Sequence, residues 1–149
     1  MKVRTIPITA LLTLLVMVPA ACGKPASSTP TVASTGLPVL SKNAAGFMDL
    51  SVEQLAQSMK NKNFALVNVH VPDPENLPNT DLSIPFDQIT GNLDKLPGKD
   101  APIVLYCRSG GMSTQAAAAL AAAGYSKVYE LDGGFNAWKA AGRELLGQQ

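Results

Sequence analysis

The sequence predicts an α/β fold in which helices flank both faces of a parallel sheet. Residues 64–69 and 102–106 are nearly continuous apolar runs, which is typical of strands that are buried on both faces. Segments with helical character follow these runs, and the alternation of strands with helices favours parallel pairing. The predicted domain, residues 43–149, is long enough to build one compact core.

The first helix of the domain is expected to begin at Ser51. Ser51 and Gln54 have the spacing of a capping box, in which each side chain bonds the backbone N–H of the other residue. Apolar residues then recur at helical spacing to about residue 60, which predicts one buried face. Residues 46–48, just before this helix, are expected to form a short edge strand.

Five further elements complete the predicted domain. They are a proline-rich loop at 71–85, a short helix or turn at 86–92, an alanine-rich helix at 113–123, a strand at 127–131 and a last helix at 135–141. Gly124 and Gly142 follow these last two helices directly, at the position where a left-handed residue commonly ends a helix.

Charge and cysteine content exclude several classes of protein. The chain has 12 basic and 11 acidic residues, a net charge of +1, which leaves no electrostatic footprint for nucleic acid or for an anionic membrane surface. Two cysteines and one histidine cannot supply the four ligands of a closed zinc site, and we predict neither a metal nor a cofactor. A disulfide scaffold would require Cys22 to pair with Cys107.

Residues 1–21 are predicted to be a bacterial secretory signal peptide. Two basic residues precede an apolar run at 8–18, which is too short for a transmembrane helix. The Ala-Ala-Cys-Gly sequence around Cys22 resembles a lipoprotein signal, in which this cysteine is lipidated. Pro19 departs from that pattern, so ordinary cleavage after Ala20 remains an alternative.

Residues 22–42 are rich in proline, serine, threonine and alanine, and they are expected to form a disordered tether. We therefore predict an exported protein, periplasmic or on the cell surface. Lipid chains on Cys22 would be its sole attachment to a membrane.

A glycine-rich loop between a strand and a helix carries the candidate chemistry. The strand ending at residue 106 delivers Cys107 to the carboxyl edge of the sheet, where open α/β sheets bind their ligands. Backbone N–H groups of the loop and of the following helix should stabilise a thiolate and lower the pKa of the cysteine. The predicted binding loop consists of Arg108, Ser109, Gly110, Gly111, Met112 and Ser113. A purely structural cysteine would not need the two glycines.

Around these residues the sequence resembles a single-domain rhodanese, a member of a sulfurtransferase family. Residues 107–113 are similar to the active-site loop of that family, and 131–142 to its downstream signature. The resemblance covers residues 46–142 and implies a parallel five-stranded sheet with helices on both faces. It also implies transfer of sulfane sulfur through a persulfide on Cys107, from a donor such as thiosulfate to a thiol, a cyanide-like acceptor or a protein.

Departures from the family pattern concern the substrate. Met112 stands where a second arginine is common, so we expect weaker binding of thiosulfate. Asn68-Val-His70 replaces the usual Asp-Val-Arg, and the segment 77–85 matches only loosely. His70 either faces the pocket and moves a proton or bonds local backbone, whereas Asn68 is expected to hold loops together.

Two other functions are alternatives to sulfur transfer. Cysteine-dependent phosphatases and arsenate reductases also hold a thiolate in an anion-binding loop, but they need an arginine that closes the loop, and here Met112 and Ser113 stand instead. A non-enzymatic persulfide carrier or a partner-binding rhodanese module remains the alternative. A carrier would load once and turn over only when its partner is present.

Overall fold

The computed structural model of the chain describes residues 36–72 and 75–147. The predicted signal peptide, Cys22 and the tether up to residue 35 lie outside the described residues. Within the described ranges, no helix combines the length and the apolar character needed to cross a bilayer.

Five parallel strands form the central sheet and confirm the predicted fold class. In spatial order they are β1 (Met48–Leu50), β6 (Val128–Leu131), β5 (Ile103–Tyr106), β2 (Ala65–Asn68) and β4 (Leu82–Ser83). The prediction that 71–85 is only a loop was wrong, because β4 lies within that segment. A separate antiparallel pair, β3 (Glu75–Asn76) and β7 (Leu146–Gly147), was not predicted.

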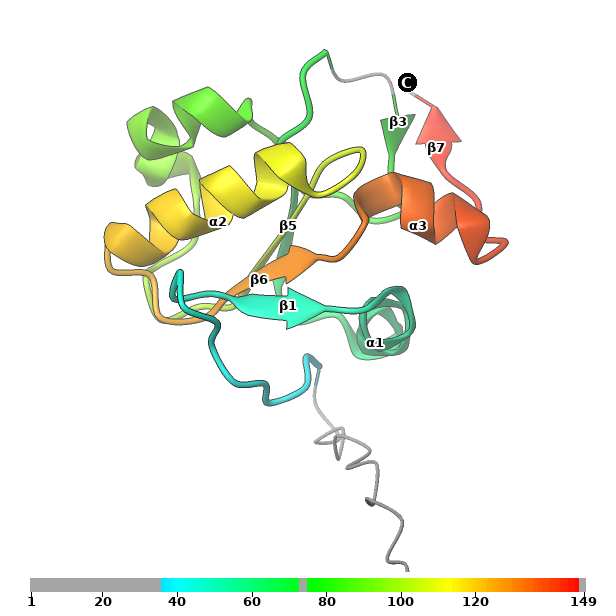
Figure 1. Ribbon diagram of the computed structural model, residues 1–149, viewed down its shortest axis with the longest axis horizontal. Helices are drawn as coiled ribbons and strands as arrows, with labels where there is room; N and C mark the ends of the chain where they lie inside the picture. The colour runs from blue at the N-terminus through cyan, green and yellow to red at the C-terminus, as the bar shows by residue number, and fades with distance from the viewer. Residues whose placement is uncertain (1–35, 73–74, 148–149) are drawn as a thin grey trace, which may run out of the picture.

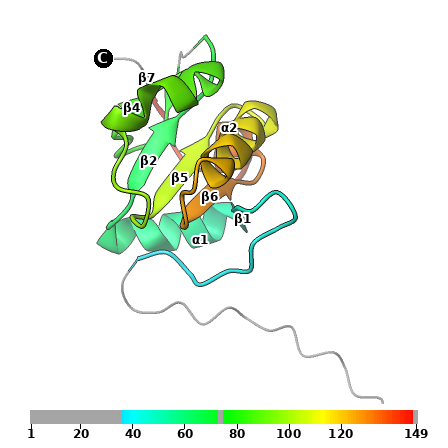
Figure 2. The same cartoon turned by 90° about the vertical axis from the view of Figure 1, so that its left-hand side faces the viewer.

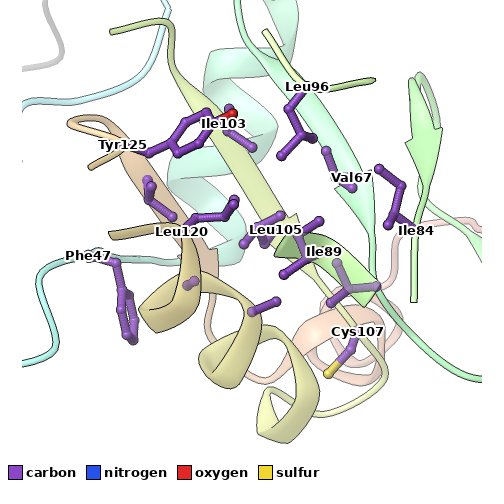
Figure 3. Packing of buried hydrophobic residues seen from close by; sticks show 14 residues of the cluster. Phe47, Val67, Ile84, Ile89, Leu96, Ile103, Leu105, Cys107, Leu120 and Tyr125 are labelled. Atoms are coloured by element: carbon purple, nitrogen blue, oxygen red, sulfur yellow. The ribbon is translucent and has the colours of Figure 1, made fainter. Parts of the chain in front are cut away.

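Helices cover both faces of this sheet (Figures 1 and 2). The helical elements are α1 (Val52–Ser58), η1 (Met59–Asn61), η2 (Phe86–Lys95), α2 (Gly111–Ala122) and α3 (Gly134–Ala140). Buried residues of α2 and η2 pack with one face of the central strands, and those of α1 and α3 with the other. Ile103 and Leu105 therefore point to the first face, shown in Figure 3, and Val104 and Tyr106 to the second.

Local signals explain where most elements begin. The predicted capping box is present: Gln54 Oε1 accepts from the Ser51 N–H at 2.9 Å, and Ser51 Oγ accepts from the Gln54 N–H at 3.3 Å. The first strand was expected at 46–48 but starts at Met48, because the chain still turns at Gly46, whose φ is +87°.

The folded unit begins before residue 43. The Tyr129 hydroxyl donates a buried hydrogen bond of 3.0 Å to the carbonyl of Pro38, and Leu37 and Leu40 pack against the cluster that contains α1 and α3. Residues 36–42, which the sequence assigned to the tether, thus contact the domain.

Candidate functional site

Cys107 follows β5 directly, at the carboxyl edge of the sheet. Its side chain is 2% exposed and is a free thiol, the one free cysteine found in the described part of the chain. Figure 3 shows it at the end of the cluster that packs against α2, with the sulfur beside that helix. The strand thus places a buried sulfur where an open parallel sheet binds its ligands.

The loop after Cys107 folds back on the sulfur. Gly110 has a φ of +99°, and this left-handed turn lets α2 begin at Gly111, two residues earlier than expected. The N–H of Gly110 donates to Sγ at 3.2 Å, and the Ser113 hydroxyl lies 3.3 Å from the same atom. The first turn of α2 therefore faces the sulfur, as the loop sequence predicted.

Burial raises the pKa of the Cys107 thiol, but hydrogen bonds to the sulfur outweigh it and lower the pKa below the ordinary value. These bonds come from the Ser113 hydroxyl and from the backbone N–H groups of Ser113, Ser109 and Met112. Because such donors favour the charged form, the loop favours the thiolate, which is the nucleophilic form of cysteine.

The backbone carbonyls of Cys107 and Arg108 accept hydrogen bonds from the segment that follows a second glycine pair. The N–H of Phe135 donates to the carbonyl of Cys107 at 2.9 Å, and the N–H of Asn136 donates to that of Arg108 at 3.0 Å. Both donors belong to the first turn of α3, which Gly133 and Gly134 bring against the loop with φ values of +70° and +56°. The start of α3 thus satisfies the loop carbonyls while N–H groups are directed at the sulfur.

Glu130 is a site residue that sequence reasoning missed. It is 2% exposed on β6, and the Ser113 hydroxyl donates to its Oε1 at 2.5 Å. Burial raises the pKa of Glu130 to about 7; the Ser113 bond opposes the rise, and the charges of Asp132 and Asp49 add to it. One feature of the sequence could have identified Glu130: it is a carboxylate within an otherwise apolar strand, just before the Asp-Gly-Gly sequence.

Replacing Glu130 by glutamine is expected to stabilise the fold, and more so as the pH rises. Glu130 holds its proton more tightly in the folded protein (pKa about 7) than at its ordinary value of 4.5, so its contribution is complete below pH 4.5 and is lost as the pH rises through 7. Glutamine removes this loss, which amounts to at most about 3 kcal/mol at pH 8.

Denaturant unfolding at about pH 5 and pH 8 would measure this gain. Glu144→Gln is the matched control, because Glu144 is exposed. An equal effect of Glu130→Gln at both pH values would contradict the prediction.

A pocket of about 340 Å³ lies against the outer side of the loop. Its lining includes His70, Glu75, Arg108, Met112, Phe135 and Lys139. Two cations therefore line it, one of which, Lys139, is paired with Glu75 at 3.2 Å. Sequence reasoning missed Lys139, because only the fold of α3 against the loop brings it there.

His70 lines this pocket, and Asn68 lies two residues before it at the end of β2. His70 is 8% exposed, and its ring meets that of Phe135 edge-on at 5.5 Å between centroids. The backbone N–H of His70 donates to Asn68 Oδ1 at 2.9 Å. The Asn68 amide donates to the carbonyl of Glu75 at 3.1 Å and to Asn76 Oδ1 at 3.0 Å, as expected for a residue that holds loops together. A proton-transfer role for His70 stays a prediction.

Three carboxylates lie close together next to the site, and their negative charges interact. Oxygens of Asp49, Glu130 and Asp132 lie within 4.8 Å of one another. Burial and then the Asp49 charge raise the pKa of Asp132, as expected where like charges crowd. Since Glu130 is already bound to Ser113, we assign no ion to this group.

The chain is similar to known proteins of one family. The family model for the rhodanese-like domain matches residues 51–141. The chain is 35% identical over 100 residues to thiosulfate sulfurtransferase GlpE of Shewanella oneidensis, covering 65% of this chain and 97% of that protein. The GlpE of Pseudomonas savastanoi pv. phaseolicola is 36% identical over 95 residues, covering 57% of this chain and 81% of that protein. A rhodanese-like domain protein from Staphylococcus aureus has a similar structure, with a TM-score of 0.58 at 25% identity, covering 68% of this chain and 98% of that one.

Proposed function

This chain belongs to the family of rhodanese-like proteins and is a sulfurtransferase. We propose that it moves sulfane sulfur from a donor such as thiosulfate to a thiophilic acceptor, and that the sulfur is carried as a persulfide on Cys107. The observation that carries this proposal is the position of the Cys107 sulfur, which ends β5 and accepts hydrogen bonds from its own loop. A thiolate in such a cradle is both a nucleophile and a neighbour of an anion-binding site.

The proposed reaction has two displacements. In the first, the Cys107 thiolate attacks the outer sulfur of thiosulfate, a bond forms between Sγ and that sulfur, and sulfite leaves with the electron pair of the broken sulfur–sulfur bond. In the second, the acceptor attacks the outer sulfur, and the electron pair of the broken bond returns to Sγ. Cyanide as the acceptor gives thiocyanate, and no other oxidant or reductant is needed.

At each step the chain's own residues would stabilise negative charge on the reacting sulfur or on the donor. N–H groups of the loop, such as that of Gly110 at 3.2 Å from Sγ, hold the thiolate and then the anionic persulfide. Arg108 and Lys139 line the adjacent pocket, where the anionic end of a donor would bind. Small sulfur donors and thiol or cyanide-like acceptors are thus the proposed partners, with a protein acceptor as a further one.

Intact mass after incubation with thiosulfate tests the proposal. The full chain should gain one sulfur atom that cyanide then removes, with sustained thiocyanate formation. Cys22→Ser is the matched cysteine control and should load equally. No gain from thiosulfate or from a polysulfide would overturn sulfur transfer through this cysteine.

The same measurement separates an enzyme from a carrier. Loading that is followed by only a single release to cyanide or to a small thiol would favour a persulfide carrier or partner-binding module. Sustained turnover with small acceptors would favour the enzyme.

Replacing Met112 by arginine is expected to lower the KM for thiosulfate about tenfold, because it adds a cation that can bond the anionic donor. Met112 already lines the pocket beside Arg108. Gln115→Arg is the control, since it adds the same charge on the exposed side of α2. An unchanged KM in Met112→Arg, measured by steady-state cyanolysis, would show that the donor's charge is not bound there.

Export and lipidation are proposed from the sequence, since the residues concerned lie outside the described ranges. A cell fed with a labelled fatty acid should incorporate the label into the wild-type protein and not into Cys22→Ser. A mature chain that begins at Ala21 without lipid would instead indicate ordinary cleavage after Ala20.

A further inference from the structure

The Ser113 hydroxyl lies between three acceptors. Its Oγ is 2.5 Å from Glu130 Oε1, 3.3 Å from Cys107 Sγ and 3.1 Å from the carbonyl oxygen of Gly110. A hydroxyl has one proton to donate and two lone pairs that accept, so it cannot serve both a carboxylate and a thiolate fully at once. Ser113 is fully buried and Glu130 is 2% exposed, so competition from water is small.

We propose that Glu130 is a positioning residue for sulfur transfer, whose proton decides whether Ser113 stabilises the Cys107 thiolate. When Glu130 is protonated, its carboxyl donates to Ser113 Oγ and the hydroxyl donates to the thiolate. When Glu130 is ionised it can only accept, and it takes the single Ser113 proton for itself. The thiolate then loses a donor, whereas a neutral thiol could still donate to Ser113 Oγ.

Glu130 and Cys107 therefore share one negative charge. With that charge on either group, every proton in the chain of bonds has an acceptor. With both groups ionised, two anions compete for one proton inside a buried site, so the second ionisation is opposed. The roles of the two residues differ, because Cys107 would bond the transferred sulfur and Glu130 acts on it only through Ser113.

The surroundings of Glu130 favour a proton on it near neutral pH. Asp49 is its partner in register on the neighbouring strand β1, and Asp132 lies two residues further along the chain. Burial is the main cause that raises the pKa of Glu130, both charges add to the rise, and the Ser113 bond opposes it, which leaves the pKa at about 7. From β5 the register partner is apolar Leu105, and from α2 the group that faces Glu130 is the Ser113 hydroxyl.

The test is the pH profile of Cys107 alkylation by iodoacetamide, measured on the full chain with Cys22→Ser. We expect the wild type to show two ionisations, one from the thiol and one from Glu130. In Glu130→Gln the amide donates to Ser113 at every pH, so a single ionisation should remain. The thiolate population should match the wild type below about pH 7, where Glu130 is protonated, and should exceed it about tenfold at higher pH, where Glu130 of the wild type is ionised. Glu144→Gln, an exposed carboxylate, should leave the profile unchanged.

Removing Ser113 distinguishes the hydrogen-bonded chain from a direct effect of charge. In a Ser113→Ala background, Glu130→Gln should change the thiolate population at least about threefold less than in the presence of the hydroxyl. An equal effect in both backgrounds, or a single ionisation in the wild type, would overturn the proposal. If Glu130→Gln does not fold, Ser113→Ala alone decides, because it should remove the second ionisation from the profile.

The inference rests on the proposed function only in taking the Cys107 thiolate as the reacting species. Alkylation needs no sulfur donor, so the two can fail separately. A chain that shows the coupled profile but gains no sulfur would contradict sulfur transfer and keep the proton coupling. A chain that loads sulfur but shows an uncoupled profile would support sulfur transfer and contradict the proton coupling.

Discussion

Replacing Cys107 by serine is expected to lower the turnover of thiosulfate and cyanide by at least about 1,000-fold and to abolish loading with sulfur. Serine keeps nearly the size of cysteine, and the site is buried, so the loop should keep its shape. The hydroxyl, however, does not ionise near neutral pH, and it cannot form a persulfide. The loss should therefore appear in kcat and not in the stability of the protein.

Steady-state cyanolysis and intact mass would measure this loss, with thermal unfolding as the check on the fold. Cys22→Ser serves as the control, since it removes the other cysteine of the chain and should leave turnover unchanged. Residual turnover above about one hundredth of the wild-type rate would mean that the sulfur atom of Cys107 is not the acceptor.

The fold could be predicted where the deciding interactions are local. Ser51 and Gln54 cap each other within one turn, and the apolar run that becomes β5 leads directly to Cys107. Strand β4 was missed because it has only two residues, which pair with β2 across a proline-rich segment. Nothing in such a short segment distinguishes a strand from a loop until the neighbouring strand is in place.

Apart from His70 and Asn68 at the end of β2, the site could be predicted only within the loop that follows Cys107. Residues 107–113 are contiguous, and their order alone indicates a sulfur surrounded by N–H groups. Glu130 and Lys139 reach the same site from β6 and α3, and their roles depend on contacts with Ser113 and Glu75 that are distant in sequence. Sequence reasoning could find the nucleophile, but not the carboxyl and the cation that the fold brings beside it.

The glycine pair at the start of α3, Gly133 and Gly134, lies directly against the backbone of the cysteine loop. A Cβ on Gly134 would overlap the carbonyl oxygen of Cys107 and would lie 2.8 Å from the carbonyl carbon of Arg108. These are backbone atoms of the cysteine loop, so the contact cannot be relieved by rotating a side chain. Either the loop or the start of α3 must move, and the bonds from Phe135 and Asn136 would then break.

We therefore expect Gly134→Ala to destabilise the protein by about 4 kcal/mol or more and to reduce sulfur loading severely. Gly142→Ala is the matched control, because Gly142 also has a left-handed backbone, with a φ of +72°, but nothing lies within 4 Å of its added Cβ. That variant should lose only the cost of the left-handed conformation, about 1 kcal/mol. Denaturant unfolding and intact mass on both variants would measure the difference. Similar losses in the two would mean that backbone conformation, and not the approach of α3 to the cysteine loop, is what glycine serves at position 134.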